Sequence, residues 1–391
     1  MSGSIDRRAF LKLGAASAGA AIGCGGATGP RDAPPGGMRY RPLGATGLQV
    51  SEVAFGAHGV DNAGVMAAAL EAGITTFCTS GGYLDGREEA ALGEAMARIG
   101  VPRERLVLMT GNDLRGNETV DSWLRDLDAS LSRLRTDFLD IYYNAMVQTP
   151  AQVRSEVLLE AFDRARAAGK VRHLGVSGHH GGLQECLEAA LECGAYEVFF
   201  TKYDFVSYPD QDQLLRRAAE RGIGTMVFKT TAGNRQREIK DLEAGGLSFR
   251  QATIRWALSN PDVASVAVTM TSFDGVAEAV AAVGAAPSAA EVAMLRRYAG
   301  EMYDRYCRFC ATCEGSCPYH VAVAEVMRYD MYFRYYGREK EAMRLYSRLP
   351  AAATAAPCRD CSGHCDGACP FGRAVRAGLL AAHEQLSFAR A

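Results

Sequence analysis

The chain of 391 residues lacks an excess of either charge, because 43 Lys and Arg residues balance 45 Asp and Glu residues and leave a formal net charge of −2. Nucleic-acid-binding proteins normally carry a basic excess, so the sequence argues against that class. Beyond its N-terminal segment the chain also lacks an apolar run long enough to span a membrane. Apolar residues are plentiful at 48%, which allows a large buried core.

The 12 cysteines are spread unevenly, since eight of them follow position 306 in two short runs. The first run is Cys307, Cys310, Cys313 and Cys317, followed by Pro318, and the second is Cys358, Cys361, Cys365 and Cys369, followed by Pro370. The first has the spacing of bacterial ferredoxins, and the second has one extra residue in its middle gap. Both runs therefore predict iron–sulfur ligation.

In two-cluster ferredoxins the fourth cysteine of each run binds the other cluster. We predict two [4Fe–4S] clusters, with one cluster as the alternative. The predicted ligands are Cys307, Cys310, Cys313 and Cys369 for one cluster and Cys358, Cys361, Cys365 and Cys317 for the other. Zinc would favour paired C-x-x-C knuckles, and cysteines so close in sequence pair poorly as disulfides.

Residues 1–37 have the features of an export signal and a linker. Arg7 and Arg8 precede Phe10-Leu11-Lys12, and a short apolar stretch follows, as in twin-arginine signals. We expect export through the twin-arginine translocase into the periplasm. Residues 21–24, which end at Cys24, loosely resemble a lipoprotein cleavage box, so a membrane anchor at Cys24 is the alternative to loss of this cysteine with the signal.

From Met38 onward, short apolar runs alternate with helix-length amphipathic segments. The expected strands end near Phe55, Cys78, Thr110, Tyr143, Ser177, Lys202, Lys229 and Val268. Eight such alternations over about 250 residues favour an α/β fold of the (β/α)₈ TIM-barrel type. A doubly wound sheet is the rival, which the lack of a G-x-G-x-x-G after the first strand weakens.

Four stretches carry a resemblance to the aldo/keto reductase superfamily. Residues 38–51 resemble its opening hairpin, residues 73–79 with Tyr83 its second strand and active-site loop, residues 131–142 the approach to its fourth strand, and residues 169–177 the run into its fifth. Members with a C-terminal ferredoxin-like extension share the whole layout. The resemblance implies a barrel that reduces carbonyls with a nicotinamide cofactor and an Asp, Tyr, Lys and His tetrad.

Only the tyrosine of that tetrad is matched here, by Tyr83. Cys78 stands at the position of the aspartate, Gly111 at that of the lysine and Ala145 at that of the histidine. A phenol without a neighbouring cation keeps a pKa of about 10 and is a poor proton donor. Since general acid catalysis contributes about 10²–10⁴-fold, conventional carbonyl reduction is in doubt.

The cofactor clamp implied by the resemblance is also reduced. Thr269, Gly275 and Ala279 stand where the family holds the 2′-phosphate and adenine with Lys, Arg and Asn. Ser177, and Phe228 at the position of the ring that stacks on nicotinamide, are the remaining candidate cofactor contacts. Binding of NADP(H) is therefore doubtful.

Other polar residues at the expected strand ends are candidates for a different site. Tyr83, Cys78 and His179 are the catalytic candidates, and His58, Asn112, Asn144, His180, Lys202 and Lys229 fall nearby. Each has a structural alternative: a packed tyrosine, a buried apolar cysteine, a solvated loop histidine or a lysine that extends from a strand end. Residues 324–346, which are rich in Tyr and Met, form a helical insert interpreted as packing the clusters against the barrel.

These features define three regions: a signal and linker at residues 1–37, a barrel at 38–290 and a mostly helical iron–sulfur domain at 291–391. The favoured function is an exported iron–sulfur oxidoreductase that exchanges electrons with an unknown redox partner. A non-catalytic electron carrier with a degenerate barrel and an NADPH-dependent reductase are the alternatives. The substrate, the partner and the oligomeric state stay open.

Overall fold

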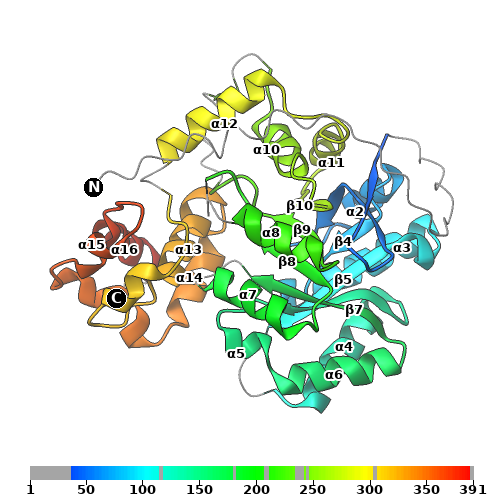
Figure 1. Ribbon diagram of the computed structural model, residues 1–391, viewed down its shortest axis with the longest axis horizontal. Helices are drawn as coiled ribbons and strands as arrows, with labels where there is room; N and C mark the ends of the chain where they lie inside the picture. The colour runs from blue at the N-terminus through cyan, green and yellow to red at the C-terminus, as the bar shows by residue number, and fades with distance from the viewer. Residues whose placement is uncertain are drawn as a thin grey trace.

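The computed structural model of the chain describes residues 37–113, 118–178, 182–206, 211–233, 242–243, 246–302 and 306–387. The predicted barrel is confirmed: eight parallel strands close in the order β10-β3-β4-β5-β6-β7-β8-β9 (Figure 1). The strands are β3 (Val53–Gly56), β4 (Thr76–Cys78), β5 (Val107–Asp113), β6 (Leu139–Ala145), β7 (Val171–Gly178), β8 (Val198–Lys202), β9 (Gly224–Phe228) and β10 (Ser265–Thr269). The predicted strand ends lie within three residues of these bounds.

Helices surround the strands because their apolar faces cover the outside of the barrel. They are α2 (Ala63–Glu71), α3 (Arg87–Ile99), α4 (Val120–Leu134), α5 (Pro150–Val153), α6 (Glu156–Ala167), α7 (Leu183–Cys193), α8 (Gln211–Glu220), α10 (Phe249–Leu258) and α11 (Phe273–Val280), with short turns η2 (Tyr83–Gly86) and η3 (Arg103–Arg105). Strand residues such as Phe55, Phe77 and Leu174 pack outward against them in one continuous core. A second core fills the barrel itself with Ile141, Val198 and other inward-facing side chains.

A hairpin closes the N-terminal end of the barrel. Strands β1 (Tyr40–Pro42) and β2 (Gln49–Ser51) pair antiparallel, and the fully buried Leu43 between them reaches the first residue of β9. A Cβ at Gly224 would lie 2.5 Å from the Leu43 side chain, so this position requires glycine. With this end closed, the carboxyl ends of the strands provide the open face where barrel enzymes place their sites.

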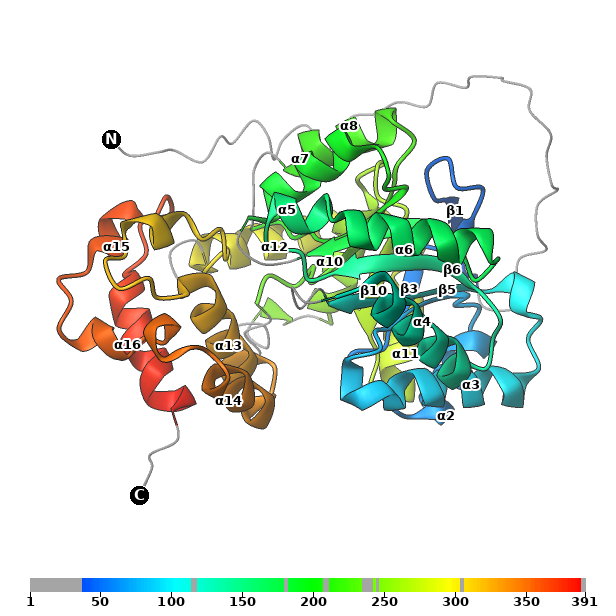
Figure 2. The ribbon, with the colours of Figure 1, turned by 90° about the horizontal axis from the view of Figure 1, so that it is seen from below.

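The C-terminal extension is helical and lies beside the barrel (Figures 1 and 2). It contains α12 (Ala289–Met302), η4 (Thr312–Ser316), α13 (Val323–Tyr335), α14 (Glu339–Ser347), η5 (Ala351–Ala353), η6 (Ala356–Arg359), α15 (His364–Ala368) and α16 (Val375–Leu386). Its core continues into the barrel through Phe249 and Ala252 of α10. In the part of the chain that the structure describes, every helix is too short or too polar to cross a membrane.

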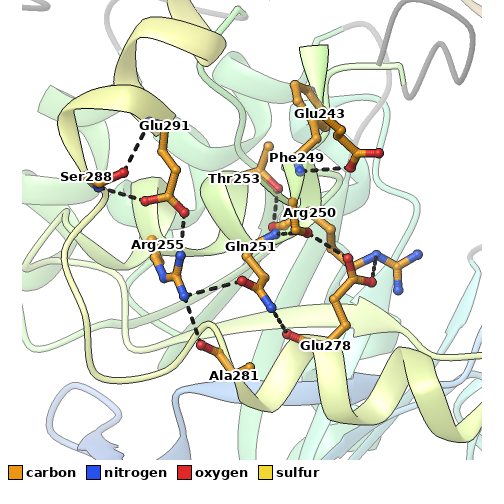
Figure 3. A network of polar contacts seen from close by, with 11 residues as sticks. Glu243, Phe249, Arg250, Gln251, Thr253, Arg255, Glu278, Ala281, Ser288 and Glu291 are labelled. Carbon is orange, nitrogen blue, oxygen red and sulfur yellow. Dashed lines mark hydrogen bonds and ion pairs between the residues drawn. The ribbon is translucent and has the colours of Figure 1, made fainter. Parts of the chain in front are cut away.

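Polar contacts fasten α12 to the barrel (Figure 3). Arg255 of α10 pairs with Glu291 of α12 and donates to the Ala281 carbonyl oxygen at 2.9 Å. Glu291 in turn accepts from the Ser288 N–H at 2.7 Å, which caps the start of the helix. The direction in which the chain leaves the barrel is therefore held by side chains of the barrel itself.

Candidate functional site at the barrel mouth

Side chains of the extension lie against the carboxyl ends of the barrel strands. Arg338 donates to the carbonyl oxygen of His58 at 3.2 Å, and Tyr332 accepts from Lys229, which directly follows β9, at 3.2 Å. The insert at residues 324–346 thus packs against the barrel, as its interpretation from sequence expects. Its position over the mouth means that the site is built from both parts of the chain.

Tyr83, the one matched tetrad residue, lies in η2 at this mouth. Its ring contacts that of His58 edge-on, with the centroids 4.4 Å apart. Burial, together with positive charge on Arg338, Lys229 and Arg328, lowers the pKa of His58 well below its ordinary value, so the imidazole is neutral at neutral pH. The Nδ1 atom of His58 is buried and has no hydrogen-bond partner among the described residues.

The residues at the three other tetrad positions are closely packed inside the barrel. Burial raises the pKa of the Cys78 thiol, which is 3% exposed, and this argues against the reactive-thiol hypothesis. A Cβ at Gly111 would lie 2.2 Å from the carbonyl oxygen of Tyr143 and 2.6 Å from its ring, so the backbone and ring of Tyr143 exclude a lysine there. Ala145 is buried inside the barrel.

The structure shows where the candidate cofactor contacts lie, but these residues do not form one binding site for a nicotinamide cofactor. Ser177 is buried at the end of β7, and the Phe228 ring packs against Phe200 with centroids 4.6 Å apart. The sequence reading missed Arg250, whose guanidinium lies beside Gly275 and pairs with Glu278 at 3.5 Å (Figure 3). His179 and His180 lie outside the described residues, as do residues 1–36 with Arg7, Arg8 and Cys24.

A cluster of cations and a phenol occupies the mouth, and sequence reasoning did not assign it a function. Tyr332 of α13 accepts hydrogen bonds from Lys229 and, at 3.3 Å, from Arg328 one helical turn earlier. Burial opposes ionisation of Tyr332, but the charges and hydrogen bonds of Lys229 and Arg328 outweigh it and lower its pKa to about 8. Burial likewise lowers the pKa of Lys229 to about 8. The sequence signal that could have revealed this cluster is the spacing of four residues between Arg328 and Tyr332.

A second lysine lies one strand away. Lys202, the last residue of β8, is 1% exposed and pairs with Asp204 at 3.3 Å. Its ammonium group lies about 5 Å from the rings of Tyr306 and Phe309, which flank Cys307. This lysine therefore points toward the first cysteine run.

The cysteines of the extension fall into two groups. A cavity is lined by Cys307, Cys310, Cys313 and Cys369, so the last cysteine of the second run joins the first three of the first run. Charge on Cys365, Cys317 and Cys361 raises the pKa of Cys358 beyond the increase from burial, which indicates that these four lie together. The described cysteines form no disulfide, and no described group of His, Cys, Asp or Glu is arranged to hold a single metal ion.

The backbone around the first cysteine group has an unusual conformation. Phe309 and Ala311 adopt left-handed φ values of 60° and 58°, which cost about 1–2 kcal/mol each for residues with a side chain. They turn the chain between successive cysteines so that Cys307, Cys310 and Cys313 line one cavity. In the second run, Gly363 takes φ 86° and its N–H donates to the Cys361 sulfur at 3.4 Å.

The fold and the strand-end residues define a barrel of the kind found in (β/α)₈ oxidoreductases. Residues 59–244 match the model of the aldo/keto reductase family. The chain is 29% identical over 222 residues to the "uncharacterized oxidoreductase YrpG" of Bacillus subtilis, covering 50% of this chain and 67% of the relative. It is 27% identical over 242 residues to the methylglyoxal reductase YeaE of Escherichia coli, covering 58% and 81%.

Solved structures agree on the fold. An aldo-keto reductase of Bacillus halodurans superposes with a TM-score of 0.54 at 22% identity and covers 66% of this chain and 96% of its own. Over its barrel the chain is therefore similar to the aldo/keto reductases, and these relatives support an oxidoreductase. The family match ends at residue 244, before the two cysteine runs.

Proposed function

We propose that the protein is an exported iron–sulfur oxidoreductase whose barrel does not work as a conventional NADPH-dependent carbonyl reductase. The observation that carries the proposal is the cavity lined by Cys307, Cys310, Cys313 and Cys369, which unites cysteines from two runs more than 50 residues apart. This is the crossed pairing that the ferredoxin-type spacing predicts.

The residues around the cavity fit a cluster. When bound, such a cluster supplies single-electron transfer. The Thr312 hydroxyl donates to the Cys310 sulfur at 3.3 Å, and hydrogen bonds of this kind tune cluster potentials. Burial raises the pKa of Cys307, while the nearby cations Arg373 and Lys202 oppose this rise and would balance the negative charge of ligated thiolates. Thiolates of a cluster bind different irons, so they need not converge on one point as the ligands of a single ion do.

A conventional nicotinamide site fits poorly. Tyr143 occupies the space that a lysine at position 111 would need. The guanidinium beside Gly275, that of Arg250, is engaged by Glu278, so a 2′-phosphate would have to compete with a carboxylate for it. These contacts support the view that NADP(H) is not held firmly.

The export part of the proposal is supported by the sequence of residues 1–37. The twin-arginine pathway carries proteins that fold and take up cofactors before transport, which suits a cluster-bearing passenger. Anchoring through Cys24 is retained as the alternative to a protein free in the periplasm.

Iron and sulfide analysis of anaerobically purified protein, with EPR of the dithionite-reduced state, tests the proposal. The expected result is brown protein with about eight iron atoms and reduced [4Fe–4S] signals. Colourless protein with stoichiometric zinc or with disulfides would overturn it. Reduction of the clusters by NADPH would instead favour the NADPH-dependent reductase.

A non-catalytic electron carrier is the second candidate. The contacts of α13 and Arg338 with the barrel mouth favour it, because an extension that serves as a docking surface would pack against this face. Electron exchange with a carrier protein, without turnover of any aldehyde or quinone, would support this candidate.

A further inference from the structure

We propose that Tyr332, held by Lys229 and Arg328, is a proton donor at the barrel mouth of a chain that has lost three of the four tetrad residues. Its substrate would be a carbonyl or quinone whose oxygen gains negative charge as the molecule is reduced. The proposal rests on the oxidoreductase function above for its source of electrons. The site combines a barrel residue with two residues of the extension.

The hydrogen bonds at Tyr332 leave its proton available. A phenol oxygen accepts two hydrogen bonds and donates one. Lys229 and Arg328 donate to it at 3.2 and 3.3 Å, and none of the described residues accepts its proton. An acceptor brought by a ligand would complete this geometry.

Two buried polar atoms near Tyr332 also lack partners in the described part of the chain. They are Nε of Arg328, which is 5% exposed, and Nδ1 of His58. Buried polar atoms without partners are costly, so their presence at one mouth indicates a missing polar ligand. Glu325 pairs with Arg328 and Glu341 lies 3.7 Å from His58, but no carboxylate pairs with Lys229 among the described residues.

Lys229 itself is held in a strained conformation. Its φ of 57° is left-handed, at a cost of about 1–2 kcal/mol for a residue with a side chain. Such strain is concentrated at functional sites because the surrounding structure must maintain it. Here the strain places an ammonium group at the carboxyl end of β9 and against Tyr332.

Reduction of the carbonyl or quinone takes two electrons and two protons, and Tyr332 supplies one of these protons. The Tyr332 O–H bond breaks, an O–H bond forms on the negatively charged oxygen of the substrate, and the phenolate remains between Lys229 and Arg328. Two transfers from a one-electron donor supply the electrons, and solvent supplies the second proton and returns the proton to Tyr332 between turnovers. The two cations stabilise the phenolate that remains after Tyr332 has donated its proton.

The charged and titratable groups around Tyr332 come from several elements. Lys229 faces it from the barrel, Arg328 and Tyr329 share its helix, and the Tyr336 ring stacks on it with centroids 5.7 Å apart. Arg338 and His58 lie near the same cations. Because the acid must be protonated to act, turnover should fall as the pH rises through about 8, the pKa of Tyr332.

The first test is a pH titration of tyrosinate absorbance in the iron-loaded protein. We expect one tyrosine to ionise near pH 8 in the wild type and in Tyr336→Phe, and this step to be absent in Tyr332→Phe. Lys229→Met should raise its midpoint by about one unit or more. If no tyrosine of the wild type ionises below about pH 10, where ordinary tyrosines titrate, the proposal is wrong.

The second test is turnover of benzoquinone and benzaldehyde with reduced methyl viologen as the electron donor. Tyr332→Phe should lower turnover by about 10²-fold or more, Tyr336→Phe should stay within about twofold, and Lys229→Arg should retain more activity than Lys229→Met. Unchanged turnover in Tyr332→Phe overturns the proposal. If neither compound reacts, the tyrosinate titration decides. Absence of iron with a normal titration would instead refute the proposed function alone.

Discussion

Lys202 and Lys229 stand at the carboxyl ends of neighbouring strands β8 and β9, yet their surroundings differ in charge. Lys202 is fully buried beside Asp204 and faces Cys307, whereas Lys229 is half-buried and contacts the phenol of Tyr332. The first belongs to a neutral pair near the proposed cluster, and the second to a cationic site at the mouth. Equivalent positions in the barrel have thus taken different functions through contact with different parts of the extension.

The largest expected effect is on stability, when the Lys202 pair is broken. Lys202→Met removes the cation that pairs with the buried Asp204 and should lower the free energy of unfolding by about 3–5 kcal/mol. Chemical denaturation measures this change. The double variant Lys202→Met with Asp204→Asn should recover most of the loss, and a single variant as stable as the wild type would remove the contrast between the two lysines.

The next effect is on turnover, when Lys229 loses its charge. Lys229→Met should lower turnover by about 10²-fold while the midpoint of thermal unfolding stays near that of the wild type, because the side chain is only half-buried. Steady-state kinetics and thermal unfolding are compared on the same preparation. A loss of stability in parallel with the loss of activity would mean that Lys229 only fastens the extension to the barrel.

A smaller effect should appear in the reduction potential. Lys202→Gln removes a cation beside Cys307 and should lower the potential of the cluster on that side, because reduction adds negative charge. Lys229→Met should leave this potential unchanged. EPR-monitored redox titration distinguishes the two variants, and an equal shift in both would place the lysines in one electrostatic environment.

The smallest effect concerns the backbone at Lys229. Lys229→Gly relieves the left-handed φ and should be about 1 kcal/mol more stable than Lys229→Met, although both lack the ammonium group. Thermal unfolding measures the difference. Equal stability would show that the backbone relaxes when the contact with Tyr332 is lost.

The barrel was predictable because its information is local. Apolar runs and amphipathic segments alternate along the chain, and the predicted strand ends fall within three residues of the observed ones. The sequence motifs also indicated that Cys78, Gly111 and Ala145 stand at the aspartate, lysine and histidine positions of the tetrad. What the sequence did not reveal is why lysine is excluded at position 111, since that depends on how closely the Tyr143 backbone approaches from the next strand.

The composite site was not predictable in the same way. Tyr332 was read as one aromatic residue among many in an insert that packs against the barrel. Its function depends on Lys229, more than 100 residues earlier, being brought within 3.2 Å of its hydroxyl. Arg250 was missed for the same reason, because it approaches Gly275 from a different helix.

The sequence alone determined the alternation that closes a barrel and the short cysteine spacings, because both depend on neighbours within a few residues. The ferredoxin-type spacing also predicted that Cys369 groups with the first cysteine run, and these cysteines line one cavity. Only the tertiary structure decided that an extension helix contacts the mouth of the barrel. Contacts between distant segments depend on how whole elements pack, and no local pattern encodes that geometry.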